Sequence, residues 1–219
     1  MKIAVINETS AADRNADILA ALQGRGHEII NVGMKKNGEK PELQYIHTGL
    51  MAAILLNLGR VQLVVGGCGT GQGFLNAVMQ YPGVVCGHIL CPLDAWLFAQ
   101  INAGNCLSLA LNQGYGWASD VNLRMIFDQF FSVEMGGGYP PHRRQPQAAS
   151  REMLRIISSQ THRPFAQILA ELSEEVVRPA MEYPGFRELL EVEKIADEEV
   201  RTALLRWDGT STNARMKGN

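Results

Sequence analysis

The segment with the clearest capacity for chemistry is a glycine-rich run, GGCGTGQG, at residues 66–73. An apolar run, VQLVV, precedes it and an apolar helical pattern follows it, so we expect it to join a strand to the start of a helix. Such a turn directs backbone N–H groups at an anion, and a thiol there feels the positive end of the helix dipole, which favours the thiolate. Cys68 and Thr70 lie in this run, and Cys68 is therefore a candidate base or nucleophile.

The same run also allows a simpler interpretation. A tight turn between a strand and a helix needs glycine in any case, and an isolated cysteine is most often a small buried side chain. Two familiar phosphate-binding patterns are excluded by spacing. The dinucleotide pattern GxGxxG needs a third glycine where this chain has Gln72 or Phe74, and the Walker pattern ends in a lysine and a hydroxyl residue that are absent here.

Short apolar runs alternate with helical patterns through the first two thirds of the chain. Strands are predicted at residues 2–6, 27–32, 61–65, 84–89 and 105–111, and helices at residues 14–23, 42–57, 73–80, 93–102 and 119–131. Five strand–helix units in series predict an α/β fold with three layers, α/β/α, around a five-stranded parallel, Rossmann-like sheet. Sites in such sheets lie at the carboxyl ends of the strands, where the glycine-rich run is placed.

The composition changes near Pro146, after which charged residues become denser. Helices are predicted at residues 148–160, 164–177 and 186–206, and residues 208–219 are predicted to be a disordered tail. We therefore divide the chain into an α/β domain at residues 1–145, a helical extension at residues 146–207 and that tail. The extension either packs back on the sheet or forms a subunit contact, and the sequence does not choose between them.

The composition excludes several classes of protein. The chain has 219 residues, 46% of them hydrophobic and 19% charged, with a net charge of -2, which argues against disorder and against a basic nucleic-acid-binding face. No apolar window is long enough for a membrane span and no signal-peptide layout is present, so we expect a cytoplasmic protein. Four cysteines and five histidines occur without CxxC or HxxxH spacing, which predicts reduced thiols and no zinc site.

Four segments together resemble a known family. They are KIAVINE at residues 2–8, GCGTGQG at residues 67–73, PLDAWLFAQINAGNCLSLA at residues 92–110 and MGGGYPPHRR at residues 135–144. Over residues 1–145 the chain is similar to the ribose-5-phosphate isomerase B and galactose-6-phosphate isomerase family of sugar-phosphate isomerases. The resemblance implies that an aldose phosphate and its ketose are interconverted through an enediol(ate), with no metal and no organic cofactor.

The resemblance also implies roles for individual residues. Cys68 falls on the base that moves a proton between C1 and C2, and Thr70 falls on a hydroxyl that assists at the sugar oxygens. Asn102 falls on an asparagine that holds a sugar hydroxyl. The backbone N–H groups expected to stabilise the enediolate belong to Gly69, Gly71 and Gly73.

Several positions depart from the family pattern. Glu8 and Thr9 stand where the family has an aspartate and a histidine, so Glu8 can still bind a sugar hydroxyl but the cationic contact at Thr9 is lost. Ile101 replaces the histidine that opens the sugar ring, and Asn112 and Tyr139 replace two arginines that bind phosphate. Each charge-assisted hydrogen bond to a phosphate contributes about 1.5–3 kcal/mol, so a typical ribose 5-phosphate isomerase is not expected.

His142 and Arg143 remain as groups that could bind an anion. A short basic run in a loop rich in glycine and proline is by itself most often solvated surface. In the family, however, this segment reaches the active site of the neighbouring subunit. The resemblance therefore implies a homodimer with shared active sites, in which His142 and Arg143 contact the substrate.

We therefore expect an aldose–ketose isomerase for a small sugar or sugar phosphate, with Cys68 as the proton-transfer base. Two other interpretations stay open. The missing histidine and arginines also fit a non-catalytic carbohydrate-binding or regulatory relative of the same fold, or one subunit of a heteromeric isomerase whose partner supplies them. A thiol at the start of the helix favours the enzyme, because a binding loop does not need one.

Overall fold

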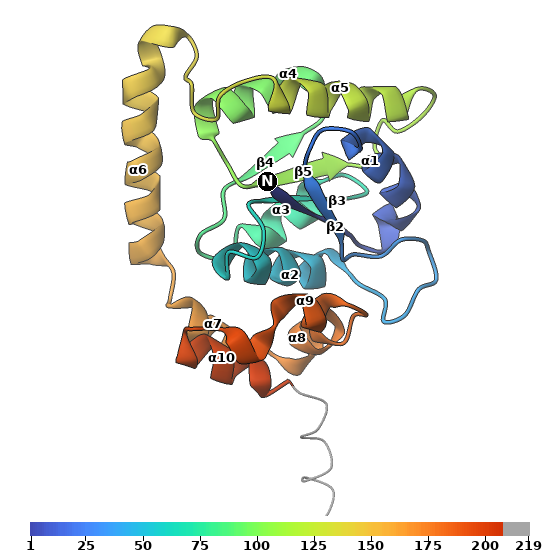
Figure 1. Ribbon diagram of the computed structural model, residues 1–219, viewed down its shortest axis with the longest axis vertical. Coiled ribbons are helices and arrows are strands. Elements are labelled where there is room, and N and C mark those ends of the chain that lie inside the picture. The colour runs from blue at the N-terminus through green and yellow to red at the C-terminus, as the bar shows by residue number, and fades with distance from the viewer. Residues whose placement is uncertain (208–219) are drawn as a thin grey trace, which may run out of the picture.

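The structure, a computed structural model that describes residues 1–207, contains a five-stranded parallel sheet with helices on both faces (Figure 1). The strands are β1 Lys2–Asn7, β2 Glu28–Asn31, β3 Leu63–Cys68, β4 Cys86–Ile89 and β5 Cys106–Ala110. Their order across the sheet is β2-β1-β3-β5-β4, and every pair is parallel. The three-layer α/β fold predicted from the sequence is confirmed, whereas the predicted tail at residues 208–219 lies outside the described residues.

In the part of the chain that the structure describes, five helices cover the sheet. They are α1 Asn15–Leu22, α2 Tyr45–Asn57, α3 Gln72–Val78, α4 Pro92–Leu97 and α5 Ser119–Phe131. Helices α2 and α3 bury their apolar side chains on one face, while α1, α4 and α5 cover the other (Figure 1). A short 3₁₀ helix at Thr9–Arg14 precedes α1, and a π-helical turn at Phe98–Asn102 extends α4. Both faces of the sheet are therefore buried, as the continuous apolar strands predict.

The C-terminal region is helical but more divided than predicted. A short 3₁₀ helix at Pro141–Arg143 leads into α6 Arg144–Thr161, followed by α7 Phe165–Glu171, α8 Glu174–Met181, α9 Phe186–Leu190 and α10 Glu198–Leu205. The single helix predicted over 186–206 is wrong, because Glu191 adopts a left-handed conformation at φ 44° and ends α9. The carboxylate of Asp197 then accepts hydrogen bonds from the N–H groups of Glu199 and Val200 and starts α10.

Helices α7–α10 are built onto the outer side of α2, which lies between them and the sheet (Figure 1). Buried side chains such as Phe186 and Leu190 belong to the same apolar core as α2 and α3. The Tyr183 hydroxyl lies 2.9 Å from the Gly33 carbonyl oxygen, which ties α8 to the loop after β2. Helix α6 differs from the others, since none of its residues is buried and it runs along the side of the molecule from the α4–α5 layer to α7 (Figure 1).

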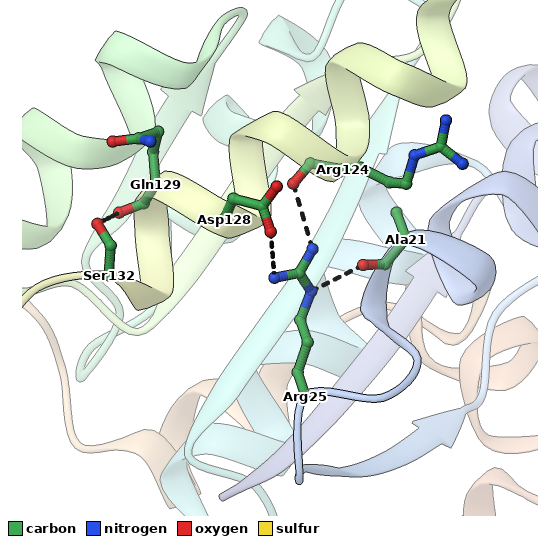
Figure 2. Close-up of polar contacts among 6 residues, drawn as sticks. All are labelled: Ala21, Arg25, Arg124, Asp128, Gln129 and Ser132. Atoms are coloured by element: carbon green, nitrogen blue, oxygen red, sulfur yellow. Dashed lines mark hydrogen bonds and ion pairs between the residues drawn. The ribbon is translucent and has the colours of Figure 1, made fainter.

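Arg25 joins α1 to α5 on the opposite face of the sheet (Figure 2). Its guanidinium donates to the Ala21 carbonyl at 2.8 Å, to the Asp128 carboxylate at 2.7 Å and to the Arg124 carbonyl at 3.2 Å. The Arg25 side chain is only 19% exposed, whereas that of Asp128 is 58% exposed. Most of the stabilisation therefore comes from the backbone contacts and the packed stem of Arg25, and little from the exposed ion pair.

Replacing Arg25 with alanine is expected to lower the free energy of unfolding by about 1–3 kcal/mol, because two carbonyl groups lose their donor and the stem leaves a gap. The matched change Asp128→Ala removes only the exposed ion pair and should cost less than about 1 kcal/mol. Urea denaturation of both variants measures the difference. Equal losses would show that the ion pair, and not the backbone contacts, joins the two helices.

None of the helices in residues 1–207 combines the length and apolar character that crossing a lipid bilayer requires.

Candidate functional site

The glycine-rich run forms the turn between β3 and α3, as predicted. Cys68 is the last residue of β3, and α3 begins at Gln72. Gly71 has φ +76°, and a Cβ atom there would stand 2.7 Å from Nε2 of His88, so only glycine fits this position. The Cys68 side chain is 6% exposed, and its Sγ lies 3.9 Å from Oγ1 of the exposed Thr70. The thiol and the hydroxyl are thus together at the carboxyl edge of the sheet.

Hydrogen bonds from the end of β5 hold this turn in place. The Cys68 carbonyl accepts the N–H of Leu111 at 3.1 Å, and the Gly69 carbonyl accepts the N–H groups of Asn112 and Gln113 at 2.9 Å and 2.8 Å. These bonds continue the β3–β5 pairing, in which Cys68 is opposite Ala110. The backbone around the thiol is therefore fixed by the neighbouring strand and not by the turn alone.

Two side chains beneath the turn add to this support. His88 Nε2 lies 2.8 Å from the Thr70 carbonyl oxygen, and the buried Ser108 hydroxyl donates to the Gly71 carbonyl at 2.5 Å. His88 and Ser108 are register partners on β4 and β5, so they meet the turn side by side. The contact of His88 with the Thr70 carbonyl is structural, since it holds the backbone of the turn. Ser108 has no signal in the sequence, because its partner lies 37 positions away.

The end of β1 brings a carboxylate to the same place. Glu8 is 3% exposed and accepts a hydrogen bond from the Ser10 hydroxyl, which in turn accepts the N–H of Gly69 at 2.9 Å. The amide of Asn112 donates to the Ser10 carbonyl at 2.6 Å. Glu8 was predicted as a site residue, but Ser10 was missed, since only the adjacency of β1 and β3 reveals its contact with Gly69.

The three glycine N–H groups expected to face an enediolate are not equivalent. The N–H of Gly69 donates to Ser10, and that of Gly71 donates to the Cys68 carbonyl at 3.2 Å, so both already serve to hold the turn. The N–H of Gly73, in the first turn of α3, has no acceptor among residues 1–207. A Cβ atom on Gly73 would approach the Tyr45 ring to 2.9 Å. Tyr45, which is 45% exposed, therefore borders the site, although no local pattern in the sequence indicates this contact.

Asn102, His142 and Arg143 lie elsewhere. Asn102 ends the π-helical turn that comes before β5, and His142 and Arg143 are exposed in the short helix before α6. The segment just before this short helix packs on the π-helical turn, where the N–H of Gly138 donates to the Gln100 carbonyl at 2.9 Å. From α6, Arg151 donates to the Ile101 carbonyl at 2.8 Å. These predicted residues therefore belong to the amino-terminal end of β5.

The two groups of predicted residues occupy opposite ends of the sheet. In the β3–β5 register Val64 is opposite Cys106, and Cys68 is opposite Ala110. A strand rises about 3.3 Å per residue, so the four steps of β5 alone separate its two ends by about 13 Å. Within one copy of the chain, Asn102, His142 and Arg143 are not brought to Cys68.

Neither the Cys106 thiol nor the surface hollow between α4 and α5 forms a second centre near Cys68. Cys106 is fully buried opposite Cys86, and burial raises the pKa of the Cys106 thiol, so it is a packing residue. Residues 1–207 contain no group of three or more histidine, cysteine, aspartate or glutamate side chains that could hold a metal ion. A surface hollow of about 600 Å³, bordered by Leu93, Trp96 and Met125, lies between α4 and α5, which cover the face of the sheet opposite to the Cys68 side chain.

Comparison with known proteins gives a consistent picture. A family model described as Ribose/Galactose Isomerase matches residues 3–147. A solved 4-deoxy-L-threo-5-hexosulose-uronate ketol-isomerase, complexed with tartrate, is 36% identical with a TM-score of 0.88, covering 94% of this chain and 99% of its own. A ribose-5-phosphate isomerase from Vibrio parahaemolyticus is 42% identical with a TM-score of 0.85, covering 93% and 99%. No curated protein sequence matches the chain.

Ribose-5-phosphate isomerase B from Clostridium thermocellum, at 22% identity and a TM-score of 0.61, is similar in fold alone. The match includes the whole Clostridium thermocellum chain but only 74% of the present chain. The two more similar structures cover at least 93% and therefore extend over the C-terminal helices. The match to the 36% and 42% identical structures therefore includes helices α7–α10, whereas the match to the Clostridium thermocellum enzyme covers a smaller part of the chain.

Proposed function

Because the chain belongs to the ribose/galactose isomerase family, we propose that this sugar isomerase is an aldose–ketose isomerase in which Cys68 moves a proton between adjacent carbon atoms. The placement of Cys68 carries the proposal. Its thiol ends β3, beside the Thr70 hydroxyl and on the same edge as the buried Glu8 carboxylate. A base, a hydroxyl and a carboxylate around one edge are the groups that proton transfer along a polyol chain needs.

The reaction proceeds through an enediolate. The Cys68 thiolate takes the proton from C2 of the aldose, and the electron pair of that C–H bond moves to form the C1–C2 double bond while the carbonyl oxygen gains the negative charge. The Thr70 hydroxyl assists proton movement at the sugar oxygens, and the N–H of Gly73 stabilises the enediolate, a contribution of about 3 kcal/mol for one such donor. Transfer of the O2 proton to O1, with formation of the C2 carbonyl, and return of the proton from Cys68 to C1 give the ketose.

We propose a uronate-derived sugar as the substrate. The 36% identical ketol-isomerase is named after 4-deoxy-L-threo-5-hexosulose uronate. In this compound C4 has no hydroxyl and C5 is a ketone. Neither position offers a hydroxyl that could close a ring on the C1 aldehyde, so no acid is needed to open one. Ile101, at the position of the ring-opening histidine in the resemblance, suits such a substrate. Thr9, Asn112 and Tyr139, which replace cationic phosphate contacts, suit it as well.

Ribose 5-phosphate is the second candidate, favoured by the 42% identity to a ribose-5-phosphate isomerase. This substrate closes to a furanose ring and has a phosphate group, so it requires both ring opening and several cationic contacts. The chain lacks the histidine and the arginines that open the ring and bind phosphate in the family it resembles, and has Ile101, Asn112 and Tyr139 at these positions. Ribose 5-phosphate is therefore retained as a competitor in the experiment below.

We also propose that the protein acts as a homodimer with shared active sites. The placement of Asn102, His142 and Arg143 at the end of the sheet opposite Cys68 supports this, since a second copy could bring them together. Helix α6 directly follows His142 and Arg143, and it exposes Met153, Leu154 and Ile157. An exposed apolar stripe of this kind is suited to a subunit contact.

Proton NMR in D₂O tests the proposed activity and substrate together. Incubation with 4-deoxy-L-threo-5-hexosulose uronate is expected to give the ketose and to introduce deuterium at the carbon that receives the proton from Cys68. Ribose 5-phosphate and free ribose, at the same concentration, should exchange much more slowly. Faster exchange of ribose 5-phosphate would select the second candidate. Absence of exchange with every sugar would select a non-catalytic relative.

A further inference from the structure

Arg14 is a cation at the carboxyl edge of the sheet, outside the motifs that suggested the site. It ends the 3₁₀ helix after β1, and its Nε donates to the Leu111 carbonyl at 3.3 Å. Its guanidinium carbon lies 4.3 Å from the centre of the Tyr115 ring. Two contacts from one loop, the β5–α5 loop, therefore fix the orientation of this arginine.

Among the described residues, the two terminal nitrogens of Arg14 have no hydrogen-bond acceptor. Among residues 1–207 no carboxylate forms an ion pair with Arg14, and its only hydrogen bond uses Nε. Asp17, the acidic residue one turn further along, instead accepts the Tyr115 hydroxyl at 2.6 Å. Burial and the Asp17 carboxylate raise the pKa of Tyr115, so the ring under Arg14 stays a neutral phenol.

The loop that holds Arg14 also holds the reactive turn. The N–H of Leu111 donates to the Cys68 carbonyl at 3.1 Å, while the carbonyl of the same residue accepts Arg14. The next residue, Asn112, donates to the backbone of Ser10, whose hydroxyl contacts Glu8 and Gly69. Arg14 thus stands beside the group formed by Glu8, Ser10 and Cys68, at the same end of the sheet.

A guanidinium held by its Nε and by the Tyr115 ring offers its two terminal nitrogens as a fork, which matches the two oxygens of a carboxylate. Because the ring contact and the Leu111 bond already fix the side chain, little conformational entropy is lost when an anion binds. The nearby positions 9 and 112 are a threonine and an asparagine, which supply no positive charge. Arg14 is therefore placed to balance a negative substrate group at this edge.

We propose that Arg14 binds the carboxylate of a sugar acid and so determines the substrate class of this site. This inference rests on the proposed function for the identity of the site, but binding of the anion does not require turnover. A phosphate group would present similar oxygens to the same fork. The experiment therefore separates a carboxylate from a phosphate and both from a purely structural role in holding the loop.

Isothermal titration calorimetry with tartrate measures the contribution of Arg14. Tartrate is the ligand in the 36% identical ketol-isomerase structure, and threitol has the same four-carbon chain with hydroxymethyl groups in place of both carboxylates. Arg14→Gln should weaken tartrate binding at least about tenfold, as expected for one lost charge-assisted contact, and should leave threitol binding and the melting temperature nearly unchanged. Arg14→Lys should restore part of the affinity.

Arg124→Gln serves as the matched control, because Arg124 forms an exposed ion pair with Asp120 on α5 and should not affect tartrate. Three results would overturn the proposal: tartrate that does not bind the wild-type protein, tartrate affinity unchanged by Arg14→Gln, or an equal loss for tartrate and threitol. In a second arm, Arg14→Gln that weakens ribose 5-phosphate but spares tartrate would assign the fork to phosphate and also overturn it. If the D₂O exchange fails while the tartrate result holds, the catalytic proposal alone is lost.

Discussion

Cys68→Ser is expected to slow isomerisation by about 10²–10⁴-fold, the range that a positioned acid–base group contributes. A serine hydroxyl has a far higher pKa than a thiol, so it does not ionise at neutral pH and cannot take a proton from C2. The substitution is small, and the backbone bonds of residue 68 to Gly71 and Leu111 do not involve the side chain. Tartrate affinity and the melting temperature should therefore change little while kcat falls.

Cys91→Ser is the matched control for this experiment. Cys91 is the N-cap of α4, where a serine is at least as favourable as a cysteine, and it belongs to neither group of predicted site residues. Turnover followed by NMR and thermal unfolding of both variants supply the measurement. If Cys68→Ser retains turnover within tenfold of the wild-type protein, Cys68 is not the base, and the thiol is a packing residue beside another proton acceptor.

Periodic patterning was enough to predict the fold, because alternating apolar strands and amphipathic helices determine which surfaces must be buried. It failed where a single backbone conformation decides the outcome. Glu191 in a left-handed conformation divides the helix predicted over 186–206, and glutamate gives no warning of that conformation. The Asp197 cap is a recognisable start signal, and it would have placed the beginning of α10.

The candidate site was predictable in its centre but not in its surroundings. The glycine-rich run identifies Cys68 and Thr70 by local spacing, because these two side chains belong to the turn that the glycines form. Ser10 and Arg14 could not be found in this way, because their partners, Gly69 and Leu111, are 59 and 97 positions away. The strand order places β1 and β5 on either side of β3, and that order is not a local property of the sequence.

Shared active sites predict that two inactive variants restore activity to each other. One variant is Cys68→Ser, and the other is the double variant Asn102→Ala with Arg143→Ala, which removes the groups at the opposite end of the sheet. In a mixed dimer one site combines both defects, and the other combines an intact Cys68 with an intact Asn102 and Arg143. The isolated mixed dimers should therefore recover about one half of the wild-type turnover, since one of the two sites in each mixed dimer is intact.

The control is a mixture of Cys68→Ser with Glu8→Gln. Both residues belong to the carboxyl-edge group, so each site of every mixed dimer keeps one of the two defects and turnover should not exceed the sum of the separate variants. Coexpression of differently tagged chains, followed by tandem purification and kcat measurement, isolates the mixed species. Recovery in the first mixture but not in the second requires that a site takes Cys68 from one copy and Asn102 and Arg143 from the other. No recovery in either mixture would mean that each copy works alone, with Asn102 and Arg143 as surface groups.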